Sequence, residues 1–106
     1  MRAKPVKLIY GEGYIDCQKE DATHITLNIP GPTGILTLPI ITKGKREGTG
    51  RWSWNGDTEK PTLRPSVLTK SYRFTCHSWI ADGYIQFLDD CSHDLVGQTV
   101  ELGEVM

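Results

Sequence analysis

Short apolar runs separated by turn residues recur along the whole 106-residue chain, and helical periodicity is almost absent. Residues 24–29, HITLNI, alternate polar and apolar side chains as a half-buried strand does. Further strands are expected at residues 6–10, 14–17, 35–41, from 67 onward, on both sides of Asp82-Gly83, and at 98–102. The pattern predicts one all-β domain over residues 1–106. We expect a small antiparallel β-sandwich or barrel with long loops and at most one short helical turn, placed near 92–96.

Composition narrows the possible partners and the compartment. A net charge of −1 gives no general attraction to nucleic acid or to an anionic membrane. No apolar run approaches the roughly 20 residues that cross a bilayer, and the basic start MRAKPVKLIYGEG lacks the apolar segment of a signal peptide. Three cysteines are an odd number, which argues against a secreted disulfide framework. A cytoplasmic protein with free thiols or metal ligands is therefore expected.

Asp82-Gly83 is a strong signal for a tight hairpin, and it fixes a register. If these are the two central residues of the turn, Ala81 pairs with Tyr84. Continuing outward, the pairs are Ile80 with Ile85, Ser78 with Phe87, and Cys76 with Asp89. Since side chains alternate along a strand, Cys76 and Cys91 share the apolar face, whereas His77 and Asp90 share the opposite, more polar face.

The thiol face has two interpretations. A free cysteine is often simply a small buried apolar residue. Alternatively, Cys76, Cys91 and His93 supply three zinc ligands, with Cys17, His24 or water as the fourth. No C-x-x-C pair is present, so the spacing matches no standard zinc finger.

The polar face has two interpretations as well. Asp90 either satisfies His77 structurally, or it orients His77 as a catalytic base toward a nucleophile. Ser78 adjoins His77 in the strand and must therefore point to the other face. Ser66 comes from the separate segment PTLRPS, which two prolines hold extended, and it is the candidate nucleophile.

Two dense motifs resemble a family of small phage and bacterial proteins. They are WSWNGDTEKPTLRPSVL and CHSWIADGYIQFLDDCSHDLVGQTVEL, which together span residues 52–102. The family is similar to the serine-peptidase-like component, BubE, of bacterial ubiquitin-like conjugation operons. Many of its members also carry an N-terminal C-P-x-C pair. This chain keeps Cys17 but has Gln18 and Glu20 where that pattern has proline and cysteine.

The resemblance implies a serine-type hydrolase that acts on the C-terminal tail or the conjugates of a bacterial ubiquitin-like protein, or on another protein substrate. Ser66 would attack, His77 would act as general base, and Asp90 would orient His77. His93 is the rival base. Asn55 is a candidate oxyanion donor, and Glu59 is a further matched polar residue. The tryptophans that would line a substrate groove are Trp52, Trp54 and Trp79. No cofactor is required in this interpretation.

The alternative function is a zinc-binding, non-catalytic interaction module. Its ligands are Cys17, Cys76, Cys91 and His93, and its partner surface is the basic segment 42–51. Nucleic-acid binding would depend only on the basic residues of this segment and the nearby tryptophans, and the net charge argues against it.

Overall fold

The first sheet gathers the N-terminal strands. The computed structural model describes residues 1–41 and 50–106. Its first four strands are β1 (Ala3–Ile9), β2 (Gly13–Asp16), β3 (His24–Ile29) and β4 (Gly34–Pro39). They form an antiparallel sheet in the order β2-β1-β3-β4. Pro39 ends β4, which lies at the sheet edge, where the sequence places a strand that contains proline.

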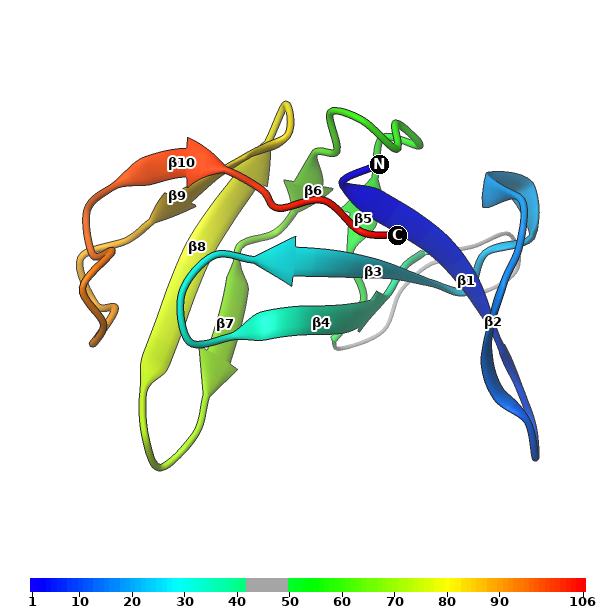
Figure 1. The fold of residues 1–106 in the computed structure, drawn as a ribbon, viewed down its shortest axis with the longest axis horizontal. Coiled ribbons are helices and arrows are strands. Elements are labelled where there is room, and N and C mark those ends of the chain that lie inside the picture. The colour runs from blue at the N-terminus through cyan, green and yellow to red at the C-terminus, as the bar shows by residue number, and fades with distance from the viewer. Residues whose placement is uncertain (42–49) are drawn as a thin grey trace.

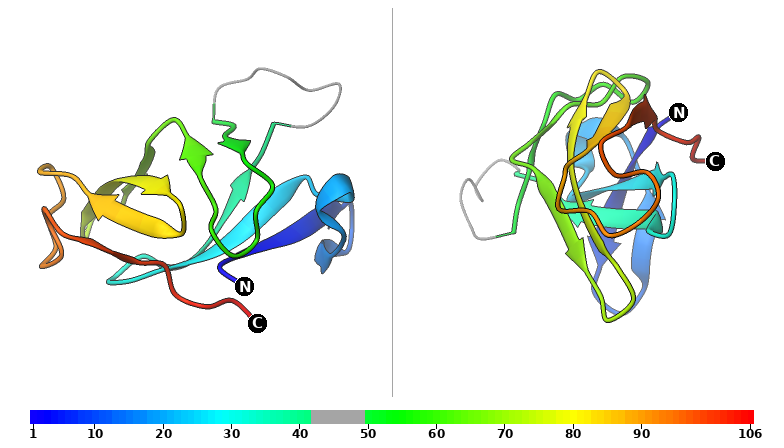
Figure 2. Two further views of the ribbon diagram at one scale, coloured as in Figure 1. Left: turned by 90° about the horizontal axis from the view of Figure 1, so that it is seen from above. Right: turned by 90° about the vertical axis from the view of Figure 1, so that its left-hand side faces the viewer.

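A second sheet carries the candidate site. Its strands are β7 (Val67–Lys70), β8 (Thr75–Ala81), β9 (Tyr84–Phe87) and β10 (Thr99–Glu101), in the order β10-β9-β8-β7. A two-stranded ribbon, β5 (Ser53–Trp54) with β6 (Leu63–Arg64), forms a third antiparallel unit. The two larger sheets lie at opposite ends of Figure 1, and the ribbon lies between them in the view from above in Figure 2. The all-β prediction is confirmed.

The core is one cluster of buried side chains to which all three units contribute. The first sheet supplies Ile25 and Leu27, the ribbon supplies Leu63, and the second sheet supplies Ile80 and Phe87. Along β8 and β9, every second residue is buried, as the hairpin register predicts. The predicted pairs from Ala81–Tyr84 to Ser78–Phe87 are all present.

One expectation about local structure is wrong, and another lies mostly outside the described residues. The helical turn expected near 92–96 is wrong, because hydrogen-bonded turns close that segment and, in the described part of the chain, helix occurs only as the 3-10 turn η1 (Lys19–Asp21). The basic segment 42–51 lies, apart from Gly50 and Arg51, outside the described residues. Among the residues that are described, no helix is long and apolar enough to span a membrane.

Candidate active site

Ser66, His77 and Asp90 form a continuous hydrogen-bonded chain on the exposed face of the second sheet. Ser66 Oγ lies 2.9 Å from His77 Nε2. On the other side of the ring, His77 Nδ1 lies 2.9 Å from Asp90 Oδ2 and 3.1 Å from Asp90 Oδ1. The arrangement has the connectivity of a nucleophile, a base and an orienting acid.

The strand register explains why Ser66 meets His77. Leu68 of β7 pairs with His77 of β8, and Ser66 precedes Leu68 by two residues. Ser66 is therefore the diagonal neighbour of His77 on the same face, within reach for side chains of these lengths. Ser78 lies on the opposite face and is 2% exposed. The Ser92 hydroxyl accepts a hydrogen bond from Thr75 N–H at 2.7 Å, so it serves the backbone instead.

A bulge beyond the hairpin brings Asp90 to the ring. The regular register would continue from Ser78–Phe87 to Cys76–Asp89 and Thr75–Asp90, but β9 ends at Phe87. Instead, Ser92 N–H donates to Thr75 O at 2.9 Å. The expected Cys76–Asp89 pair is therefore wrong: Asp89 and Asp90 bulge out as extra residues. Bulges commonly redirect a side chain in this way.

The tautomer of His77 follows from its partners. An ionised carboxylate only accepts hydrogen bonds, so Nδ1 carries the proton and donates to Asp90. In the neutral ring, Nε2 is then an acceptor, and the Ser66 hydroxyl donates to it. The His77 side chain is 26% exposed, and the Asp90 side chain is 60% exposed. The ring is thus oriented as a base for Ser66, although its carboxylate partner is much more open to water than a buried triad aspartate.

The three tryptophans have different surroundings. Trp52 and Trp54 are half-buried and pack against the core, and Trp54 also lines a pocket of about 430 Å³ together with Ile40 and Ile41. The Trp52 indole N–H donates to Ser66 O at 3.2 Å and thereby helps to fix the backbone of the candidate nucleophile. Trp79 is 38% exposed on the same face as His77.

Two neighbours of this face were not among the sequence-based candidates. The Arg64 guanidinium lies over the Trp79 ring, 5.5 Å from its centroid. Leu68, the strand partner of His77, is exposed. The pairing of β7 with β8 was not fixed by any turn signal in the sequence, so the position of Leu68 beside His77 could not be read from it.

Asn55 and Glu59 make their contacts away from Ser66, His77 and Asp90. The Asn55 amide donates to Lys60 O at 3.1 Å, and its oxygen accepts from Asp57 N–H and Thr62 N–H. This side chain closes the turn after β5, and among the described residues its hydrogen bonds are all with backbone groups of residues 57–62. Glu59 is exposed and lies 3.8 Å from the N-terminal amine. Neither residue makes a hydrogen bond to the Ser66–His77–Asp90 chain.

The remaining candidates lie on the other face of the sheet. Cys76, Cys91 and His93 offer ligand atoms within 4.8 Å of one another. Cys17 is not part of this cluster; it follows β2, at the far end of the molecule in Figure 1. The proposed set of four ligands is therefore not assembled, and a metal here would rely on three protein ligands. His93 makes no hydrogen bond to Ser66, so His77 is the base that the geometry supports.

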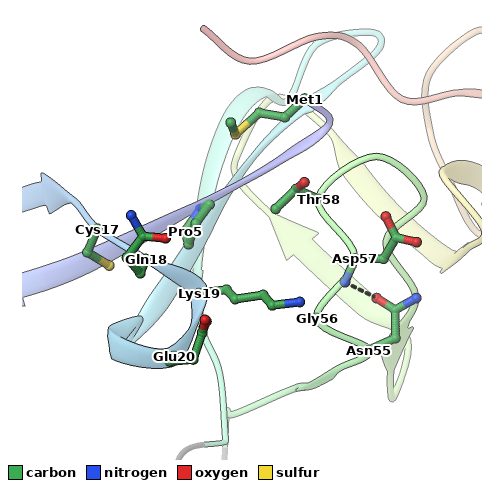
Figure 3. Close-up of a pocket in the computed structure, with 10 residues that line it drawn as sticks. All are labelled: Met1, Pro5, Cys17, Gln18, Lys19, Glu20, Asn55, Gly56, Asp57 and Thr58. Carbon is green, nitrogen blue, oxygen red and sulfur yellow. Dashed lines mark hydrogen bonds between the residues drawn. The ribbon is translucent and has the colours of Figure 1, made fainter.

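A well-formed pocket lies away from these residues. It has a volume of about 690 Å³ and lies between η1 and the turn after β5 (Figure 3). Cys17, Lys19 and Asp57 are among its lining residues. Burial raises the pKa of the Cys17 thiol, and nearby carboxylates add to this effect. A thiol with a raised pKa is a poor nucleophile, and no histidine lines the pocket. The candidate catalytic residues therefore lie on the open face of the second sheet and not in this pocket.

Comparison with known proteins identifies the family of the chain. The family described as BubE, the serine protease of a bacterial ubiquitination-like system, matches residues 5–88. Neither curated proteins nor solved structures give a match. The matched region includes Ser66 and His77 and ends just before Asp90. Because the match covers most of the chain, the protein belongs to the BubE family of serine proteases from bacterial ubiquitination-like systems.

Proposed function

We propose that the protein is a serine-type hydrolase that cleaves the C-terminal tail or the conjugates of a bacterial ubiquitin-like protein, with Ser66 as nucleophile. The observation that carries this proposal is the pair of 2.9 Å contacts that join Ser66 to His77 and His77 to Asp90. Three separate segments supply these side chains, so local sequence proximity does not account for their meeting. The family match supports the reaction class.

The residues divide the chemistry between them. His77 Nε2 takes the Ser66 hydroxyl proton as Oγ attacks the scissile carbonyl, and it then returns that proton to the leaving amine. Asp90 keeps Nδ1 protonated and stabilises the imidazolium that forms. Water next attacks the acyl–Ser66 ester, with His77 as base again, and releases the enzyme. Proton transfer of this kind contributes typically about 10²–10⁴ in rate.

The surface around Ser66 suits an extended, uncharged or acidic tail. Leu68 and Trp79 flank His77 with exposed apolar surface, and the Arg64 guanidinium over Trp79 adds a fixed positive charge. A ubiquitin-like tail offers extended backbone and, after cleavage, a new carboxylate that Arg64 can bind through its planar fork. The family's place in a ubiquitination-like system supports this substrate class.

A Ser66→Ala variant tests the proposal directly. We expect its kcat/KM on a tail-extended ubiquitin-like protein to fall by at least about 10³-fold, because no other group replaces the nucleophile. A fluorophosphonate probe, which esterifies activated serines without needing the natural substrate, should label the parent and not this variant.

Ser53→Ala is the matched control. Ser53 is exposed, and among the described residues its hydroxyl makes one hydrogen bond, a long one of 3.4 Å to Arg64 O. We expect this variant to be labelled and to cleave like the parent. If Ser66→Ala cleaves as fast as Ser53→Ala, the assignment of the nucleophile is wrong.

A further inference from the structure

Behind the proposed catalytic face, the same segments place two thiols and an imidazole together. The Sγ atoms of Cys76 and Cys91 and a ring nitrogen of His93 lie within 4.8 Å of one another. Cys76 is 3% exposed and Cys91 is 8% exposed, so both thiols are withdrawn from solvent. The His93 ring packs edge-on against Phe87, with 4.9 Å between ring centroids. Among residues 1–41 and 50–106, this is the only group of three or more side chains placed so that they could bind a metal ion.

In the part of the chain that the structure describes, two buried polar atoms of this region have no hydrogen-bond partner: His93 Nε2 and Thr33 Oγ1. Buried polar atoms are rarely left unpaired, since losing the hydrogen bonds that water provides is unfavourable. His93 Nδ1 is occupied, because it accepts from Leu95 N–H at 3.2 Å. Thr33 lies beside the Cys76 thiol. The unpaired nitrogen thus belongs to the same residue that completes a set of metal-binding groups.

We propose that Cys76, Cys91 and His93 bind one zinc ion through their two sulfurs and His93 Nε2. Thiolate and imidazole donors suit zinc, with bonds of about 2.3 Å to sulfur and 2.0 Å to nitrogen. Donors at those bond lengths around a tetrahedral ion are about 3.5–3.8 Å apart. The present cluster therefore needs only a small inward movement of the side chains. The fourth position falls to water, near the unpaired Thr33 hydroxyl.

The proton balance of binding is defined. Zinc displaces one proton from each thiol, so two protons are released to solvent. Because Leu95 N–H donates to Nδ1, the neutral His93 ring carries its proton on Nε2. That proton moves to Nδ1 when Nε2 binds the ion, and the Leu95 hydrogen bond is lost. At 3.2 Å this bond is at the long end of the usual range, so little opposes the exchange.

The site would also hold the proposed catalytic residues in place, and this step depends on the proposed function. Cys91 Sγ accepts a hydrogen bond from His77 N–H at 3.2 Å and donates one to His77 O at 3.1 Å. As a thiolate, Cys91 loses the second bond, while the first becomes stronger. Cys91 directly follows Asp90, the last residue of the bulge. An ion that joins Cys91 to Cys76 therefore fixes the bulge to β8 and holds Asp90 beside His77. In this view, zinc is a positioning element and takes no part in the bond-breaking step.

Zinc content tests the site independently of activity. The full chain, purified under reducing conditions, should contain about one zinc per molecule by elemental analysis and should give thiolate-to-metal charge-transfer absorption when loaded with cobalt(II). His93→Gln removes one ligand with little change in volume, and we expect it to weaken zinc binding by more than about 100-fold, beyond the effect typical of outer-shell changes.

Cys17→Ser is the matched control, since Cys17 is outside the cluster. It should bind zinc like the parent, whereas Cys91→Ser should not. If the folded parent takes up less than a tenth of an equivalent of added zinc, or if Cys17→Ser loses zinc as Cys91→Ser does, the site is refuted. Ser66→Ala should keep its zinc. If it stays active, the proposed nucleophile fails while the metal site stands.

The positioning step has its own readout. Removing zinc from the parent with a chelator should lower kcat several-fold, and it should have no effect on Asp90→Asn, which already lacks the carboxylate that the ion would position. A parent that holds zinc but whose kcat does not respond to the chelator would refute the positioning role. Equal losses of kcat in both proteins would refute it as well.

Discussion

On the exposed face of the sheet formed by β7, β8 and β9, His77 contacts Ser66 and Asp90; on the buried face, Cys76 and Cys91 lie with His93 against the core. The two sets are interleaved in the chain, because Cys76 precedes His77 and Asp90 precedes Cys91. Alternation along the strand and the bulge after β9 separate them. One short stretch of backbone thus carries two chemically distinct sets of side chains, one open to solvent and one largely withdrawn from it.

The difference between the faces lies mainly in access. The exposed face offers a hydroxyl and an imidazole to a substrate, whereas the buried face offers thiols that no macromolecule can reach. Burial raises the pKa of the Cys76 thiol, which makes this cysteine a poor nucleophile. Substituting a residue of one type, such as histidine, should therefore affect cleavage strongly on the exposed face and only weakly on the buried face.

The largest contrast should come from the two histidines of this region. We expect His77→Ala to lower kcat/KM by at least about 10³-fold, because it removes the general base and the acid for the leaving group. His93→Gln should lower it by no more than about tenfold, because His93 does not contact Ser66. Steady-state cleavage of the tail-extended ubiquitin-like protein measures both. The reverse order of effects would make His93 the base.

Asp90 and Asp89 provide the next comparison, since the two are adjacent and exposed but only Asp90 contacts His77. Asp90→Asn should lower kcat by about 10²-fold, less than the roughly 10⁴ of a buried triad aspartate, because water shares the task of orienting the ring. Asp89→Asn should leave kcat near the parent value. Equal, small effects would show that Asp90 is only a structural partner of His77.

Trp52 links the two faces, since its ring packs on the core while its N–H reaches Ser66 O. Trp52→Phe keeps an aromatic ring and removes the donor. We expect a fall in kcat of about three- to tenfold and a loss of about 0.5–1.5 kcal/mol in the free energy of unfolding, the usual net value of one hydrogen bond. Trp54→Phe is the control, because its N–H bonds to Asp57 O, away from Ser66. Similar falls in kcat for both variants would contradict this role for Trp52.

The sequence predicts contacts between residues that are close in the chain better than contacts between strands that are distant in it. The Asp82-Gly83 turn fixes its register locally, so the faces of His77 and Cys76 were predictable. The bulge at Asp89-Asp90 was not, because it depends on Ser92 pairing with Thr75. The sequence proposed Ser66 through family resemblance and extended backbone, whereas its contact with His77 requires β7 to pair with β8.

The same limit applies to other candidates. The part that Asn55 plays in closing a turn was not predicted, because it involves Lys60 and Thr62. Cys17 was grouped with the other cysteines by residue type alone. Its position at the end of β2 follows from the pairing of β1 with β2 and β3, which separates it from β8. Residue type predicted the chemistry, and long-range pairing decided which groups meet.

His24, the third histidine, lies outside the candidate site. We expect its substitution to change the pH dependence of stability and to leave cleavage unchanged. Burial, and then the charge of Arg51, lower the pKa of His24 below its ordinary value. The folded state therefore binds this proton less readily than the unfolded state, so the contribution to stability is present above the unfolded pKa of about 6.5 and is lost as the pH falls through the folded pKa.

We expect the urea midpoint of the parent to fall more steeply below pH 6.5 than that of His24→Gln, with the two curves parallel above pH 7.5. Cleavage by His24→Gln should match the parent at neutral pH, because His24 lies in the other sheet, with its Nδ1 on Thr23 Oγ1 at 2.9 Å. A steeper loss of stability in the variant would reverse the sign argued here. A large loss of activity would mean that the first sheet takes part in the reaction, and the separation of chemistry between the two faces of the second sheet would then be incomplete.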